Sequence, residues 1–222
     1  MEKSDYFNEL GPRWDEISRH DMDKVETIVR LLGIRQGDAV LDVGTGTGVL
    51  IPLLSRRTGA ENITAIDFAP AMIERAREKF GGSGVQFIVG DVMEYPFRDA
   101  SFDVIVCYSV FPHFDNHAAA LDRFTGFLKP GGLLAVLHSQ SRERINGVHI
   151  HSGDITVHHD YLPSLEVVAN LMRSGGLRME IMVDNDEFYM ACGRKTWRHG
   201  AEYGHHHDAH GHDSGHRHVG QG

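Results

Sequence analysis

The feature that constrains this chain most is a short apolar strand that runs directly into three closely spaced glycines. Residues 38–48 read DAVLDVGTGTG. The apolar run in this segment is typical of a strand in the middle of a parallel sheet that is covered on both faces. Gly44, Gly46 and Gly48 have no Cβ, so the backbone can turn sharply and pass close to a ligand. Residues 49–54 then read as a helix start with Pro52 in its first turn. This order predicts a nucleotide-type pocket in an α/β fold.

The spacing of the glycines bears on which nucleotide the pocket takes. The dinucleotide fingerprint is Gly-x-Gly-x-x-Gly, whose third glycine permits close helix packing beside a bound pyrophosphate. Here the third glycine comes one residue early, and Val49 stands where the fingerprint has Gly. Asp42 lies beside the loop, where its charge would repel a pyrophosphate and attract an ammonium or sulfonium group. The pattern therefore disfavours NAD.

The segment VLDVGTGTG resembles the first motif of class I S-adenosylmethionine (SAM)-dependent methyltransferases, and later stretches fall where that family would place them. The resemblance implies an α/β fold, a three-layer Rossmann-like sandwich with a seven-stranded, mostly parallel sheet. Two expected strands, residues 177–184 and 187–194, resemble the antiparallel C-terminal hairpin of the family. The resemblance also implies a small-molecule methyltransferase that transfers a methyl group from SAM by in-line displacement.

Acidic residues follow two further expected strands. Asp67 lies 21 residues after Gly46, an offset at which a carboxylate can reach the ribose hydroxyls of a nucleoside, although it could instead cap the following helix. By resemblance, Asp91 bonds the adenine amine and Val92 supplies a backbone N–H to the ring; the alternative is a turn aspartate that bonds its own backbone. The full set of expected cofactor-binding residues is Asp42, Gly44, Thr45, Gly46, Gly48, Asp67, Phe68, Asp91, Val92, Met93, Cys107 and Tyr108.

The segment after the expected fourth strand (residues 102–108) disfavours nucleic-acid substrates. Nucleic-acid amino-methylases carry an (Asn/Asp/Ser)-Pro-Pro-(Tyr/Phe) element at this place, and residues 109–113 read SVFPH instead. The formal net charge of −9 also argues against a protein that grips phosphate backbones. We therefore expect a small-molecule substrate and no nucleic-acid partner.

The expected fifth strand, residues 133–137, leads into a polar stretch, residues 138–160, which we expect to be a loop at the carboxyl edge of the sheet. His138 and His149 are candidate general bases, since an ordinary histidine pKa of ~6.5 suits neutral pH. Arg142 is a candidate clamp for a substrate carboxylate or phosphate. A histidine at a strand end is more often a packed, hydrogen-bonded group, and these histidines could also bind a metal that orients the acceptor. His113 completes the set of catalytic candidates.

The two ends of the chain differ from the central domain. We expect residues 1–36 to form an N-terminal helical cap or lid, residues 37–194 the SAM-binding domain, and residues 195–222 a disordered tail. Tyr6, Phe7 and Trp14 resemble an aromatic segment that folds over the active site in many small-molecule methyltransferases; the alternative is that they only anchor the N-terminus.

The tail is rich in histidine and almost free of apolar residues. Imidazoles at short spacing bind Ni, Co or Zn without defining one geometry. The candidate metal ligands are His205, His206, His207, His210, His212, His216 and His218. An alternative function is therefore a metal-binding accessory or metal-trafficking protein on a methyltransferase scaffold, which would use this tail and the 138–160 loop.

Composition and the absence of targeting signals bound the remaining possibilities. With 222 residues and 41% hydrophobic content, the chain suits one α/β domain. Cys107 and Cys192 lie in apolar runs and imply no disulfide framework. No signal pattern or bilayer-spanning run occurs, so we expect a cytoplasmic protein without a membrane partner. The methyl acceptor and the oligomeric state, a homodimer included, stay open.

Overall fold

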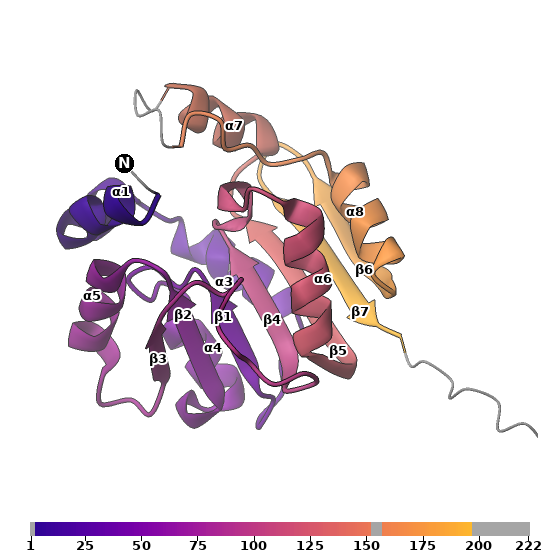
Figure 1. Cartoon of the computed structure of the whole chain (residues 1–222), viewed down its shortest axis with the longest axis horizontal. Helices are drawn as coiled ribbons and strands as arrows, with labels where there is room; N and C mark the ends of the chain where they lie inside the picture. The colour runs from indigo at the N-terminus through magenta and orange to yellow at the C-terminus, as the bar shows by residue number, and fades with distance from the viewer. Residues whose placement is uncertain (1–2, 152–156, 197–222) are drawn as a thin grey trace, which may run out of the picture.

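The computed structural model describes residues 3–151 and 157–196, with residues 149–151 described by their backbone alone. Seven strands form one sheet in the order β3-β2-β1-β4-β5-β7-β6 (Figure 1). The first five strands are parallel, and β7 runs antiparallel to both β5 and β6. The strands are β1 (Val40–Val43), β2 (Ile63–Asp67), β3 (Gln86–Val89), β4 (Phe102–Tyr108), β5 (Leu128–His138), β6 (Leu177–Asp184) and β7 (Tyr189–Lys195). The predicted mostly parallel sheet with an antiparallel hairpin is confirmed.

Helices cover both faces of this sheet. The helices are α1 (Lys3–Leu10), α2 (Trp14–Ile17), α3 (Met22–Leu31), α4 (Ile51–Thr58), α5 (Pro70–Phe80), α6 (His117–Phe127), α7 (Arg142–His151) and α8 (Leu165–Ser174), with short 3₁₀ turns at Gly11–Arg13 (η1), Ala60–Asn62 (η2) and Phe111–His113 (η3). One apolar core joins the sheet to α3 and α4, and another joins it to α6 and α8. In the described ranges, every helix is too short or too polar to cross a lipid bilayer.

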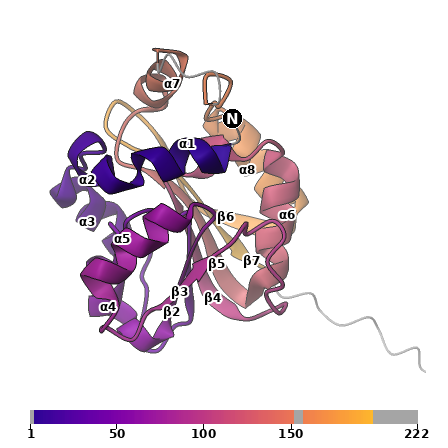
Figure 2. The ribbon, with the colours of Figure 1, turned by 60° about the vertical axis from the view of Figure 1, so that its left-hand side comes forward.

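The N-terminal helices lie over the carboxyl end of the parallel strands, beside α5 (Figure 2). The Asn8 Oδ1 atom accepts a hydrogen bond from the Ala71 backbone N–H at 3.0 Å, in the first turn of α5. Phe7 is buried in a small cluster with Ala69 and Met72. A Cβ on Gly11 would lie 2.7 Å from the Ala71 Cβ, so only glycine permits this approach. The N-terminal segment is therefore packed on the domain through specific contacts.

Two local expectations differ from the structure. The expected polar loop contains α7, because Ser141 accepts a hydrogen bond from the Arg144 N–H at 3.3 Å and the buried Ile145 anchors the first turn. The fifth strand, expected at residues 133–137, is longer at its start: β5 begins at Leu128, and its pairing with β4 shifts in register, since Phe102 pairs with Leu128 and Val104 pairs with Leu133.

Candidate functional site

The glycine loop after β1 holds a backbone shape that other residues rarely adopt. Gly44, Gly46 and Gly48 have φ angles of 63°, 54° and 88°, in the left-handed region that favours glycine. A Cβ on Gly44 would lie 2.3 Å from the Val110 Cγ2 atom. The loop is thus fitted closely against the segment that follows β4.

The Asp67 carboxylate, at the end of β2, is bound to this loop. Its Oδ2 atom accepts a hydrogen bond from the Gly46 N–H, and its Oδ1 atom accepts one from the Ala69 N–H, both at 2.9 Å. Burial raises the pKa of Asp67 to about 6, against the lowering effect of the two backbone N–H groups and of His113. The carboxylate is therefore positioned and poorly hydrated, and a ligand that donates to it or carries positive charge would favour its ionised form.

Asp42 is buried beneath the same loop, with 2% of its surface exposed. Thr45 Oγ1 donates a hydrogen bond to Asp42 Oδ2 at 2.7 Å. Burial raises the pKa of Asp42 to about 7; the Thr45 hydrogen bond lowers it and the negative charge of Asp67 raises it further. Asp42 lines neither of the cavities described below. Asp42 would therefore influence a ligand without contact, through its negative charge and through its hydrogen bond to Thr45 of the loop.

Asp91 follows β3 in a turn. Its Oδ1 atom accepts a hydrogen bond from the Met93 backbone N–H at 2.8 Å, the local contact of a turn aspartate. Asp91 is nonetheless exposed and lines a cavity together with Val92 and Met93. One carboxylate oxygen thus stabilises the turn, and Asp91 still faces the cavity.

Two adjoining cavities open above the carboxyl ends of β1, β2 and β4. The first measures about 520 Å³ and extends under α2, over the glycine loop. The second measures about 750 Å³ and extends towards β3 and the start of α1. Both are of a size that holds nucleoside-sized ligands, which occupy pockets of roughly 300–1,000 Å³. The residues that line both cavities are Gly44, Asp67, Phe68, Val110 and His113.

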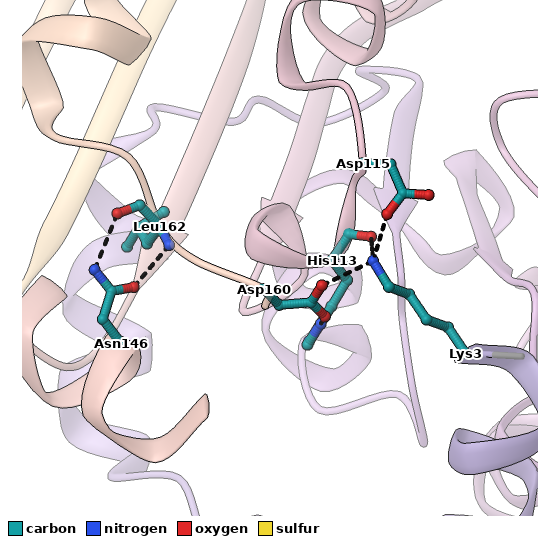
Figure 3. A network of polar contacts seen from close by, with 6 residues as sticks. All are labelled: Lys3, His113, Asp115, Asn146, Asp160 and Leu162. Carbon is teal, nitrogen blue, oxygen red and sulfur yellow. Dashed lines mark hydrogen bonds and ion pairs between the residues drawn. The ribbon is translucent and has the colours of Figure 1, made fainter. Parts of the chain in front are cut away.

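His113 stands at the junction of the two cavities and belongs to a polar network (Figure 3). Its Nδ1 atom is 2.6 Å from Asp160 Oδ2. Lys3 Nζ, from α1, lies 2.8 Å from Asp160 Oδ1 and 2.7 Å from Asp115 Oδ1, and donates to the His113 carbonyl oxygen at 2.8 Å. Burial alone would raise the pKa of Asp160, but the hydrogen bonds of His113 and Lys3 hold it below its usual range. The network ties the N-terminal helix to the site.

Two other catalytic candidates, His138 and Arg142, line neither cavity. His138 ends β5, is 3% exposed and lies edge-on to the Tyr189 ring, with centroids 6.1 Å apart. Arg142 Nε donates to Asp184 Oδ2 at 3.1 Å, at the end of β6. His149 lies in α7, where only its backbone is described. Of the three catalytic candidates whose side chains are described, only His113 lines a described cavity. Cys107, expected among the cofactor-binding residues, lines neither cavity, because it is buried within β4, and burial raises the pKa of its thiol.

The structure adds a residue that sequence reasoning missed. His20 precedes α3 and lines the first cavity. Its Nδ1 atom is 2.9 Å from Tyr108 Oη, and Tyr108 Oη is 2.8 Å from Ser139 Oγ. No motif marks this histidine, because its partners come from the ends of β4 and β5. The only local signal is its place within the expected N-terminal cap, residues 1–36.

The structure offers no metal centre in the part of the chain that it describes, where no group of three or more His, Cys, Asp or Glu side chains is placed to hold an ion. The seven candidate ligands of the tail, His205 to His218, lie outside the described residues. A metal at the expected 138–160 loop therefore has no support from the described side chains.

Comparison with known proteins shows which family the residues around this site resemble. Residues 41–136, from β1 into β5, match the family model described as a methyltransferase domain. Over these residues the chain carries a methyltransferase domain, which supports the resemblance to class I SAM-dependent methyltransferases. The matched region contains the glycine loop, Asp67 and Asp91, and the family implies SAM as the cofactor.

Curated relatives match about three-fifths of the chain. The chain is 33% identical over 138 residues to a demethylmenaquinone methyltransferase of Thermus thermophilus, covering 59% of this chain and 63% of the relative. It is 31% identical over 140 residues to a demethylmenaquinone methyltransferase of Staphylococcus aureus, covering 60% of this chain and 58% of the relative. The chain thus spans about three-fifths of the length of these relatives.

Solved structures share the fold over most of the chain. A putative methyltransferase of Haloferax volcanii, in complex with the Trm112 methyltransferase activator, aligns with a TM-score of 0.71 at 19% identity, over 89% of this chain and 99% of that one. A SAM-dependent methyltransferase from Aquifex aeolicus aligns with a TM-score of 0.66 at 22% identity, over 83% of this chain and 97% of that one. At these identities the likeness shows the fold alone.

Proposed function

We propose that this chain transfers a methyl group from SAM to a small aromatic acceptor. The observation that carries the proposal is the bond between Asp67 and the Gly46 N–H, because it joins the glycine loop to a strand-end carboxylate at the junction of two ligand-sized cavities. A dinucleotide would bring a pyrophosphate to this loop, beside two buried carboxyl groups. A sulfonium ligand brings positive charge there instead.

We assign the adenosine part of the cofactor to the second cavity. Asp67 would accept hydrogen bonds from the ribose hydroxyls, since each of its oxygens receives one backbone N–H and retains a lone pair. Phe68 would lie against the adenine ring. Asp91 would accept from the adenine amine, and the adjoining Val92 and Met93 would bound the ring edge. These roles follow from the lining of the cavity and the resemblance of the motifs.

We assign the methionine part of the cofactor and the acceptor to the first cavity. The backbone of the glycine loop bounds this cavity, and the buried Asp42 would attract the ammonium and sulfonium charges from beneath it. SAM supplies a methyl group on a sulfonium, which leaves with its bonding pair on sulfur. The protein then has to align the acceptor behind that methyl group and exclude water.

Aromatic side chains favour a flat acceptor. The lining of the first cavity includes Phe7, Trp14, Phe68, Phe80 and Tyr108. Rings of this kind stack on or pack edge-on to an aromatic ligand. The relatives of Thermus thermophilus and Staphylococcus aureus are named for an acceptor of this chemistry, demethylmenaquinone. We propose α1 and α2 as the lid of this cavity, because Phe7 and Trp14 come from them.

Two measurements test the proposal on the full-length protein. The first is calorimetric titration with SAM and with S-adenosylhomocysteine, for which we expect one site per chain. The second is incubation with methyl-labelled SAM and a panel of acceptors that contains demethylmenaquinol, made by chemical reduction of demethylmenaquinone, simple phenols and aliphatic amines. We expect label only in the aromatic hydroxyl compounds or quinols. Binding without transfer to any aromatic acceptor would overturn the acceptor class, and the absence of SAM binding would overturn the function.

A further inference from the structure

A row of four hydrogen-bonded side chains runs along the wall of the first cavity. Ser18 Oγ lies 3.2 Å from His20 Nε2, and His20 Nδ1 lies 2.9 Å from Tyr108 Oη. Tyr108 Oη in turn lies 2.8 Å from the Oγ of the buried Ser139. Ser18, His20 and Tyr108 all line the first cavity and do not line the second. The row therefore belongs to the acceptor side of the site.

Each of the two tautomers of His20 satisfies the row, in opposite directions, and the tautomer protonated at Nδ1 is the one that can act as a base at Nε2. If His20 Nδ1–H donates to Tyr108 Oη, the tyrosine O–H donates to Ser139 Oγ, and His20 Nε2 becomes an acceptor. The contact of Nε2 with Ser18 is the longest of the three, at 3.2 Å. A ligand hydroxyl can replace that contact at small cost, because Ser18 lies on the same cavity wall. The Nε2 atom is thus the position at which the row can receive a proton.

The surroundings keep this histidine neutral and able to accept a proton. Burial lowers the pKa of His20, and the negative charge of Asp15 opposes that effect. Asp15 is itself paired with Lys79, 2.6 Å away. Burial also raises the pKa of Tyr108, which stays a phenol at neutral pH. The charged or titratable groups that face the same cavity are Asp15 of α2, Arg19 beside His20, Asp67 of β2, Lys79 of α5, Tyr108 of β4 and His113 of η3.

His113 is less suited to the same role. It lines both cavities, its Nδ1 atom contacts Asp160, and its charge would act on Asp67, the proposed ribose ligand. His20 is confined to the acceptor side. We therefore place His113 at the junction of the two cavities and His20 beside the acceptor.

We infer that His20 Nε2 takes the proton from a hydroxyl group of the methyl acceptor, and that Tyr108 positions the ring through Nδ1. This inference rests on the proposed function and names the acceptor more closely, as a phenol or an enol. In the step, the acceptor oxygen or its conjugated carbon forms the bond to the methyl group, and the carbon–sulfur bond breaks with its electron pair left on sulfur. The hydroxyl proton passes to His20 and leaves to water when the product departs, so charge and protons balance.

The test uses full-length protein saturated with S-adenosylhomocysteine and the probe 4-nitrophenol, whose phenolate absorbs visible light. The matched ligand 4-nitroanisole has the same ring and no acidic proton. The variants are His20→Gln, Tyr108→Phe and, as a matched control, His158→Gln, an exposed histidine that lines neither cavity. Spectra are recorded at a pH at which the free probe is mostly phenol.

We expect wild type and His158→Gln to bind 4-nitrophenol as its phenolate and to prefer it over 4-nitroanisole. His20→Gln should lose the phenolate band and bind the probe about 10- to 100-fold more weakly, because a charge-assisted hydrogen bond is lost. Tyr108→Phe should weaken binding about tenfold, while 4-nitroanisole binding changes little. Far-UV circular dichroism of all variants should match wild type, which checks the fold, and His158→Gln should bind S-adenosylhomocysteine like wild type.

Three results would overturn the inference: a phenolate band that persists in His20→Gln, no preference of wild type for the phenol over the anisole, or no effect of Tyr108→Phe. Failure of wild type to bind S-adenosylhomocysteine would instead contradict the proposed function. The two failures are thus distinguishable.

Discussion

The carboxylate of Asp67 and the backbone N–H of Gly46 lie 2.9 Å apart, although 21 residues separate them in the sequence. The contact joins the end of β2 to the loop that follows β1. The loop and the carboxylate therefore form one rigid surface at the junction of two cavities. A ligand that contacts one of them also depends on the position of the other.

Ligand binding should release protons near neutral pH. Burial raises the pKa of Asp42 to about 7 and that of Asp67 to about 6. A cationic ligand favours the ionised carboxylates and lowers both pKa values, so the affinity for SAM should rise as the pH increases from 5 to 8. The rise should be up to about tenfold for each unit by which a pKa falls. Calorimetry at pH 6.5 in two buffers of different ionisation enthalpy measures the released protons, and heats that do not depend on the buffer would contradict the account.

Asp42→Asn should stabilise the ligand-free protein at high pH. The folded-state pKa of Asp42, about 7, lies above the ordinary value of 3.8. The stabilisation from this group is thus full below pH 3.8 and is lost as the pH rises through 7. At pH 8 the amide removes a buried charge and still accepts from Thr45, so the free energy of unfolding should rise by about 1–3 kcal/mol.

Urea unfolding at pH 4 and pH 8 checks this effect of Asp42→Asn. The two proteins should differ little at pH 4, where the carboxyl is protonated, and should differ clearly at pH 8. The variant should also bind SAM more weakly, with less effect on methylthioadenosine, which lacks the cationic groups. A variant that is less stable at pH 8 would refute the assigned buried charge.

Gly44→Ala should disrupt the loop. The φ angle of Gly44 is 63°, and a Cβ there would lie 2.3 Å from Val110 Cγ2. We expect a loss of about 1–3 kcal/mol of stability and a larger loss of SAM affinity, because the loop would shift away from Asp67. The matched control is Gly82→Ala, since no atom lies within 4 Å of a Cβ built there. Thermal unfolding and SAM titration of both variants provide the measurement; equal effects would count against the account.

Lys3→Met should loosen the N-terminal helix. Lys3 Nζ contacts both Asp115 and Asp160, and the Asp160 side chain is 6% exposed. Loss of these contacts leaves a buried carboxylate with fewer partners, which costs on the order of 1–3 kcal/mol. Hydrogen exchange of α1 should become about tenfold faster or more. Arg173→Gln, in an exposed pair with Glu166 on α8, is the control and should leave α1 unchanged. Unaltered exchange in Lys3→Met would show that these contacts do not hold α1 in place.

The framework of the fold could be predicted because its signals are local. The run 102–108 is apolar except for Asp103 and forms β4 with those bounds. Asp67 lies at the end of a buried strand, at an offset from the loop that depends only on the length of one helix and one strand. Each of these signals lies within a few residues of the element that it marks.

The acceptor side could not be predicted in the same way. His20 comes near Tyr108 and Ser139 only because the cap folds over the ends of β4 and β5. The stretch after β5 is polar, and the helix α7 within it depends on a single serine cap and on the packing of Ile145. Arg142 pairs with Asp184 across the fold, a contact that no local pattern indicates.

The most direct test of the central claim is calorimetric titration of the full-length protein and of Asp67→Asn with SAM and, separately, with NAD. Asp122→Asn, on the exposed side of α6, is the control. The account predicts that wild type and the control bind SAM and not NAD, and that Asp67→Asn binds SAM about 10- to 100-fold more weakly. Tight binding of NAD with no heat from SAM, or an unchanged SAM affinity in Asp67→Asn, would contradict it.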